Sequence, residues 1–132
     1  MKRMLSLIVL LAVVCFAAVA TAADLPNLIG TWEGAPTVHD SKGGYYTGKL
    51  VLNITEQKGN AFHGSKTYQM VSQRKERTEG FSGTISSGGQ IFIADHEDGY
   101  MIGDITKDGG MELQYGHTGK KAVAVHVVLK KK

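Results

Sequence analysis

The segment 45–56, YYTGKLVLNITE, decides the fold class because its apolar side chains recur at every second position. A period of two places successive side chains on opposite sides of a strand, so the segment predicts a β-strand with one buried face. No stretch of the chain shows a convincing helical period. The predicted inward face comprises Tyr46, Gly48, Leu50, Leu52 and Ile54.

Glycine-containing turns divide the rest of the chain at regular intervals. All 17 glycines follow residue 23, and most of them fall in short clusters such as Gly88-Gly89 and Gly109-Gly110. Such clusters supply the positive φ angles that tight hairpin turns require. Segments rich in β-branched and aromatic residues lie between them and predict eight strands: 28–34, 45–56, 61–71, 77–86, 90–95, 99–107, 111–117 and 121–131.

Eight consecutive strands with short turns favour an all-β, eight-stranded antiparallel up-and-down barrel. Closure removes the exposed sheet edges that invite aggregation. The alternative is a β-sandwich, but its crossovers usually need several long connections. Only Ala35–Gly44 is long here, and we expect it to be a loop.

Residues 1–23 have the pattern of a secretory signal peptide. Lys2 and Arg3 are followed by an uncharged apolar run and by the small residues Ala20-Thr21-Ala22. We expect cleavage near Ala22 or Ala23, which leaves residues 24–132 as a single domain without a membrane anchor. The alternatives are that residues 1–23 remain as a membrane anchor or that a lipid is attached at Cys15. The run is short for a membrane span, and Val14 stands where lipid attachment prefers a small residue.

The expected mature chain contains no cysteine and is close to neutral. Removing Lys2 and Arg3 lowers the formal net charge from +3 to +1, so composition does not predict a nucleic-acid partner. A small exported domain without disulfides depends on its core and its strand pairing. These features favour the bacterial periplasm, or secretion, as the location.

The only tryptophan of the chain lies in the segment 28–34, LIGTWEG. Gly30 and Trp32 are two positions apart and therefore face the same way in a strand. We expect Gly30 to leave space and Trp32 to plug one end of the barrel. Gly30-Thr31-Trp32 resembles the Gly-x-Trp motif that begins the first strand of the calycin group, the lipocalins and avidins.

This resemblance implies an exported eight-stranded barrel, and the avidin-like branch is closer in length. Avidins line their biotin pocket with several tryptophans, whereas the expected mature chain has one, which argues against biotin. Lipocalins are longer, often contain a disulfide and end in a helix, and this chain matches none of those features.

Aromatic residues on the strands are the candidates for lining a pocket. Their rings suit a small apolar ligand, and tyrosine hydroxyls are tolerated near a wet barrel mouth. Simple core filling is the alternative for each. The candidates are Tyr46, Tyr68, Phe81, Tyr100 and Tyr115.

Whether the His126 side chain faces the cavity or the solvent depends on the orientation of the last strand, 121–131. If the face of Ala124 and His126 points inward, His126 enters the cavity and an apolar stripe outside predicts a homo-oligomer. If the larger face of Val125 and Val127 points inward, His126 is a surface residue. The second orientation is the simpler one.

Motifs for catalysis, metals and cofactors are not found. The sequence has no Gly-x-Ser-x-Gly motif, and its glycine clusters join strands, whereas phosphate-binding loops open helices. The polar turn Asp95–Gly99 lacks the alternating ligands of a calcium loop. We therefore predict no catalytic residues, no metal and no cofactor.

The sequence thus favours a binding protein that is not an enzyme. The first hypothesis is a pocket for a small apolar or amphipathic molecule, which rests on analogy of fold. The alternative is a periplasmic protein-binding module, such as an inhibitor of a protease or lysozyme. A cavity favours the first, and a filled interior with a protruding 35–44 loop favours the second.

Overall fold

The computed structural model describes residues 24–71 and 75–132, so the predicted signal peptide lies outside the described residues. The described chain is all β, with nine strands and no helix. Within these two ranges, no helix is long and apolar enough to cross a membrane. The strands are β1 (Gly30–Gly34), β2 (Thr37–Asp40), β3 (Gly44–Lys58), β4 (Ala61–Met70), β5 (Arg77–Ile85), β6 (Gln90–Asp95), β7 (Tyr100–Ile105), β8 (Met111–His117) and β9 (Val123–Lys131).

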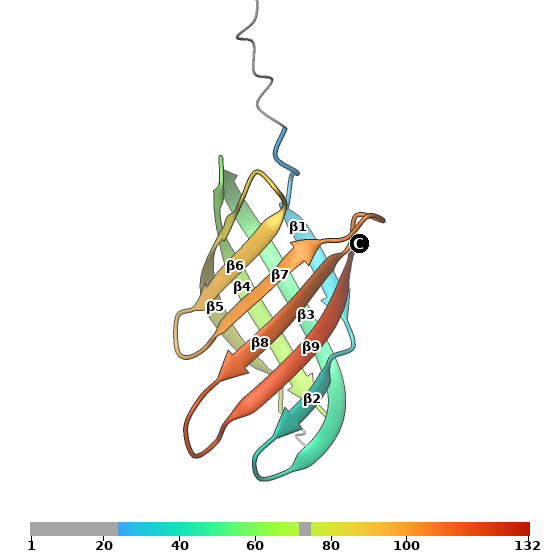
Figure 1. Ribbon diagram of the computed structural model, residues 1–132, viewed down its shortest axis with the longest axis vertical. Helices are drawn as coiled ribbons and strands as arrows, with labels where there is room; N and C mark the ends of the chain where they lie inside the picture. Colours follow the sequence, from blue (N-terminus) through green and yellow to red (C-terminus); the bar gives the residue numbers. More distant parts are fainter. Residues whose placement is uncertain (1–23, 72–74) are drawn as a thin grey trace, which may run out of the picture.

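The strands form one closed antiparallel barrel (Figure 1). From β3 to β9, each strand pairs with the next one along the chain. Both β1 and β2 pair with β3 on one side and with β9 on the other, and these pairings close the wall. The predicted eight-stranded up-and-down barrel is therefore confirmed, with one additional strand.

β1 and β2 together occupy a single position in the wall. Gly34 lies opposite Leu50 in β3, and Thr37 lies opposite Thr47, so the register continues across the interruption. The interruption coincides with Pro36, which has no N–H to give to a neighbouring strand. The prediction that Ala35–Gly44 is a loop was wrong for half of the segment: residues 37–40 form β2 and residue 44 begins β3. Val38 points into the barrel, where it is buried.

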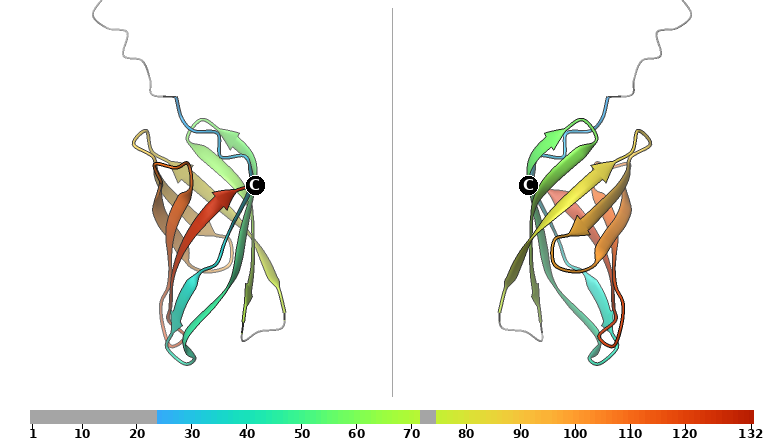
Figure 2. Two further views of the ribbon diagram at one scale, coloured as in Figure 1. Left: turned by 90° about the vertical axis from the view of Figure 1, so that its right-hand side faces the viewer. Right: turned by 90° about the vertical axis from the view of Figure 1, so that its left-hand side faces the viewer.

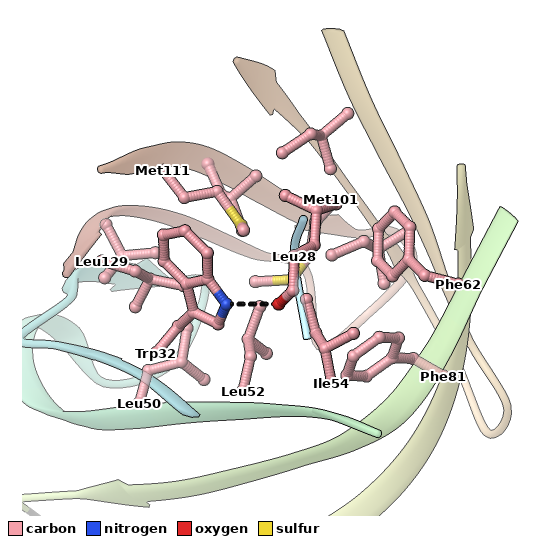
Figure 3. Close-up of a cluster of buried hydrophobic side chains, with 14 of the residues drawn as sticks. Leu28, Trp32, Leu50, Leu52, Ile54, Phe62, Phe81, Met101, Met111 and Leu129 are labelled. Carbon is pink, nitrogen blue, oxygen red and sulfur yellow. Dashed lines mark hydrogen bonds between the residues drawn. The ribbon is translucent and has the colours of Figure 1, made fainter. Parts of the chain in front are cut away.

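The apolar core fills the part of the barrel near the chain termini. The alternation predicted for residues 45–56 is confirmed, since Leu50, Leu52 and Ile54 are buried in the core. Figure 3 shows Trp32 among them, with its indole N–H donating to the carbonyl oxygen of Leu28 at 2.8 Å. Trp32 is 3% exposed and Leu28 is fully buried, so the two residues pack as one unit.

The segment before β1 is fastened over this end of the barrel. The Gln57 side chain accepts a hydrogen bond from the Leu28 N–H at 2.8 Å and donates one to the Pro26 carbonyl at 3.1 Å. On the other side, Lys131 donates to the Asn27 carbonyl, and its ammonium lies 5.5 Å from the centroid of the Trp32 ring. These contacts close this end of the barrel. The β2–β3 hairpin lies at the opposite end, as the side views in Figure 2 show.

Candidate ligand-binding cavity

A cavity of about 180 Å³ lies inside the barrel at the end where β2 lies. Deeper lining residues such as Leu50 and Met101 are buried, while Tyr46, Met70 and Val123 are partly exposed. This gradient indicates that the cavity opens toward the β2 end. Its wall is mainly apolar and includes Pro36, Val38, Leu50, Met70, Met101, Val123 and Val125.

Three buried charged side chains meet at this cavity. The Nζ atom of Lys66 in β4 lies 2.6 Å from Oε1 of Glu79 in β5, and it also donates to Oδ2 of Asp95 in β6. The three side chains are 5%, 8% and 0% exposed, respectively. Lys66 and Glu79 line the cavity directly, and Asp95 lies behind them. An ammonium and two carboxylates thus share a water-poor environment, where electrostatic interactions are strong.

Tyrosine rings surround the ammonium of Lys66. Its Nζ atom lies 4.6 Å from the centroid of the Tyr115 ring and 5.4 Å from that of Tyr68. Both distances are within the range of cation–π attraction. The ammonium therefore has two carboxylate partners and two aromatic partners.

Alternation along the strands explains how the charged residues reach the interior. Lys66 lies four positions after the buried Phe62, and Glu79 lies two positions before the buried Phe81. Asp95 lies two positions after Ile93, which is also buried. Sequence reasoning missed all three, although each lies on the inward face that the period of two from these apolar neighbours defines.

Asp95 retains an acceptor that no protein donor satisfies. Its Oδ1 atom is buried and has no hydrogen-bond partner within the described residues. Burial raises the pKa of this carboxyl and outweighs the opposing effect of Lys66, and the nearby Glu79 raises it further. The cluster is therefore rich in acceptors and poor in donors.

Of the predicted pocket residues, Tyr46, Tyr68 and Tyr115 line the cavity. Phe81 is fully buried in the apolar core and does not line it. Tyr100 is 48% exposed and stacks on Phe92, with the ring centroids 6.1 Å apart. The prediction that Tyr100 faces inward was wrong, because its neighbour Met101 takes the inward position.

His126 lies on the exposed outer face of β9, where its Nε2 atom is 2.7 Å from Oε1 of Glu112. Val127 and Leu129 are buried, so the larger apolar face points into the barrel. His126 is therefore not a cavity residue. The expected oligomer depended on the opposite orientation of this strand, so its premise is not met.

Polar contacts at the open end hold two of the lining tyrosines. Burial, together with a hydrogen bond to Asp40, raises the pKa of Tyr46 to about 12. Asp40 also accepts from the backbone N–H groups of Lys42 and Gly43 in the β2–β3 turn. The Tyr115 hydroxyl donates to the Asp98 carbonyl at 3.1 Å. Both tyrosines are thus held in place by a neighbouring turn.

The turn Asp95–Gly99 does not act as one polar cluster. Asp95 points inward, whereas His96 lies outside and its Nε2 atom is 3.0 Å from the Ser82 hydroxyl. Within residues 24–71 and 75–132, no group of three or more histidine, cysteine or acidic side chains is arranged to hold a metal. Comparisons with protein-family models and with curated proteins find no match to this sequence.

Proposed function

We propose that this protein binds a small amphipathic molecule in the cavity at the β2 end of the barrel. The observation that carries the proposal is the combination of an apolar wall with a buried polar group, Lys66 with Glu79, at one side of it. Ligand sites commonly join an apolar lining to a few polar groups that fix orientation. The proposal includes export, because residues 1–23 have the pattern of a signal peptide.

The cavity volume limits the size of the ligand. A cavity of about 150 Å³ lined by apolar side chains is large enough for benzene. The cavity here is about 180 Å³ and is open at one end. A single ring or a short alkyl chain would fill it, with any longer part of the ligand extending past Tyr46 into solvent.

The proposal is for binding without catalysis. The Lys66 ammonium donates to Asp95 and forms an ion pair with Glu79, an arrangement typical of a fixed polar group and not of a reactive amine. The alternative, an inhibitor that binds a protein through a protruding 35–44 loop, has less support because residues 37–40 belong to the barrel wall as β2.

The test is native mass spectrometry of protein purified, without refolding, from the cells that produce it. Val125→Trp would fill the cavity, and Val128→Trp, on the outer face of the same strand, is the matched control. We expect wild type and Val128→Trp to carry extra mass that disappears on denaturation, and Val125→Trp to lack it. A bare polypeptide mass for wild type, together with capture of a protein partner, would favour the inhibitor.

A further inference from the structure

The hydrogen-bonding capacity left in the charged cluster is dominated by acceptors. An ammonium has three N–H donors. The Lys66 ammonium donates to Asp95 and forms an ion pair with Glu79, and its Nζ atom also lies near the rings of Tyr68 and Tyr115. Glu79 lines the cavity and retains its second carboxylate oxygen. The ammonium of Lys66 is thus already paired with two carboxylates, whereas Glu79 presents a carboxylate to the cavity that can accept from a donor.

The formal charges of the cluster point the same way. One ammonium stands against two carboxylates, and all three side chains are at least nine-tenths buried. A surplus negative charge in a poorly hydrated site is costly, and it is relieved either by a proton, which the raised pKa of Asp95 favours, or by a cation. Arg77 lies two positions before Glu79, on the same face of β5, and is a candidate for balancing this charge. It is exposed, however, so solvent screens its charge.

The unpartnered Asp95 Oδ1 is a second, independent observation. Native proteins pair nearly all buried polar atoms, so this unpaired acceptor leaves the cluster short of a donor. The Asp95 side chain is fully buried behind Lys66 and Glu79. A cation placed against Glu79 would also reduce the electrostatic cost of this second carboxylate.

We infer that the ligand is a small amine that binds as a cation, with its ammonium on Glu79 and its hydrocarbon part against the apolar wall. This inference rests on the proposed function and names its ligand class. The hydrocarbon part lies against Leu50, Met70, Met101 and Val125. The ring of Tyr46, which is partly exposed, lines the cavity at its open end.

The test is isothermal titration calorimetry of the wild-type protein at pH 8 with hexylammonium, hexanol and hexanoate. The three probes have nearly the same hydrocarbon part and differ in the charge of the polar end. The amine of hexylammonium resembles that of lysine, with a pKa of about 10.4, and stays protonated at this pH. We expect hexylammonium to bind about 10- to 100-fold more tightly than either of the others, as charge-assisted hydrogen bonds predict.

Glu79→Gln removes the acceptor charge, and Glu112→Gln, on the barrel exterior, is the matched control. We expect Glu79→Gln to lose the preference for hexylammonium and Glu112→Gln to retain it. If Glu79→Gln does not fold, the wild-type series still decides the charge preference. Val125→Trp, which leaves the charged residues in place, should abolish hexylammonium binding, whereas Val128→Trp should not.

Two results would overturn the inference. If hexanol or hexanoate binds wild type as tightly as hexylammonium, the cavity binds amphipathic molecules but does not select a cation, and the proposed function stands. If none of the three binds, the amine class is wrong. The bound mass in native mass spectrometry then decides separately whether the cavity has another ligand.

Discussion

The Nζ atom of Lys66 lies 2.6 Å from Oε1 of Glu79 inside the barrel, where both side chains are almost fully buried. Removing one partner of a buried ion pair leaves an uncompensated charge and typically costs about 3–5 kcal/mol. We therefore expect Lys66→Met to lower the free energy of unfolding by about this amount at neutral pH, as measured by urea unfolding. A loss below about 1 kcal/mol would contradict the burial of this cluster.

The Lys66→Met defect should depend on pH. Burial already raises the pKa of Asp95 in the presence of Lys66, and without the ammonium both carboxyls should favour the neutral form still more. A carboxyl with a raised pKa in the folded state contributes stability at low pH that is lost as the pH rises. The difference from wild type should thus be smaller at pH 5 than at pH 8.

A control variant separates lost charge balance from lost packing. Replacing the whole cluster, as Lys66→Met with Glu79→Leu and Asp95→Leu, leaves no charge unpaired. Such apolar replacements are often neutral or stabilising, by up to about 4 kcal/mol. We expect the triple variant to unfold at a urea concentration no lower than wild type, while hexylammonium binding is lost. This result would indicate that the cluster is retained for binding.

Trp32 and Leu28 stabilise the closed end together. Trp32→Ala should cost about 3–5 kcal/mol, because it empties a large volume of the core. Trp32→Phe retains an aromatic ring but leaves the Leu28 carbonyl without its donor, and we expect a loss of about 1–3 kcal/mol. Urea unfolding measures both. Equal stability of wild type and Trp32→Phe would show that the indole hydrogen bond contributes nothing.

Tyr46 should titrate well above an ordinary tyrosine. Burial and the hydrogen bond with Asp40 raise its pKa to about 12, whereas an unfolded tyrosine titrates near about 10. The raised pKa contributes stability that is complete below pH about 10 and is lost as the pH rises through the folded-state value. Absorbance of the phenolate, with Tyr46→Phe for assignment, measures this pKa.

Asp40→Asn tests the cause of that shift. It removes the negative charge beside Tyr46 and should lower the Tyr46 pKa, leaving only the effect of burial. Thr37→Ala, an exposed change in the same strand, serves as the control and should leave the pKa unchanged. An unchanged pKa in Asp40→Asn would assign the whole shift to burial.

The barrel could be predicted from the sequence because alternation and glycine turns agree along most of its length. β2 was missed because Pro36 and Gly43-Gly44 are typical of a loop, and only the pairing with β3 and β9 shows a continued register. Local sequence does not contain that information. A strand of four residues next to a proline can be identified only from the strands with which it pairs.

The site was harder to predict than the fold. Lys66, Glu79 and Asp95 occupy inward positions by simple alternation, but charged side chains in strands are ordinarily assigned to the solvent face. Burial becomes tolerable only because three strands bring opposite charges together. The orientation of Tyr100 was mispredicted for another reason: both faces of β7 begin with apolar residues, and only Asp104, on the face of Tyr100, marks that face as the outer one.

Nuclear magnetic resonance of the five tyrosine rings during a hexylammonium titration tests the central claim most directly. Three of them, Tyr46, Tyr68 and Tyr115, line the cavity. The other two, Tyr45 and Tyr100, are 84% and 48% exposed on the outside and serve as internal controls. We predict saturable shifts of the three cavity rings and none of the outer two. Unchanged cavity rings, or equal shifts of all five, would contradict a ligand site inside the barrel.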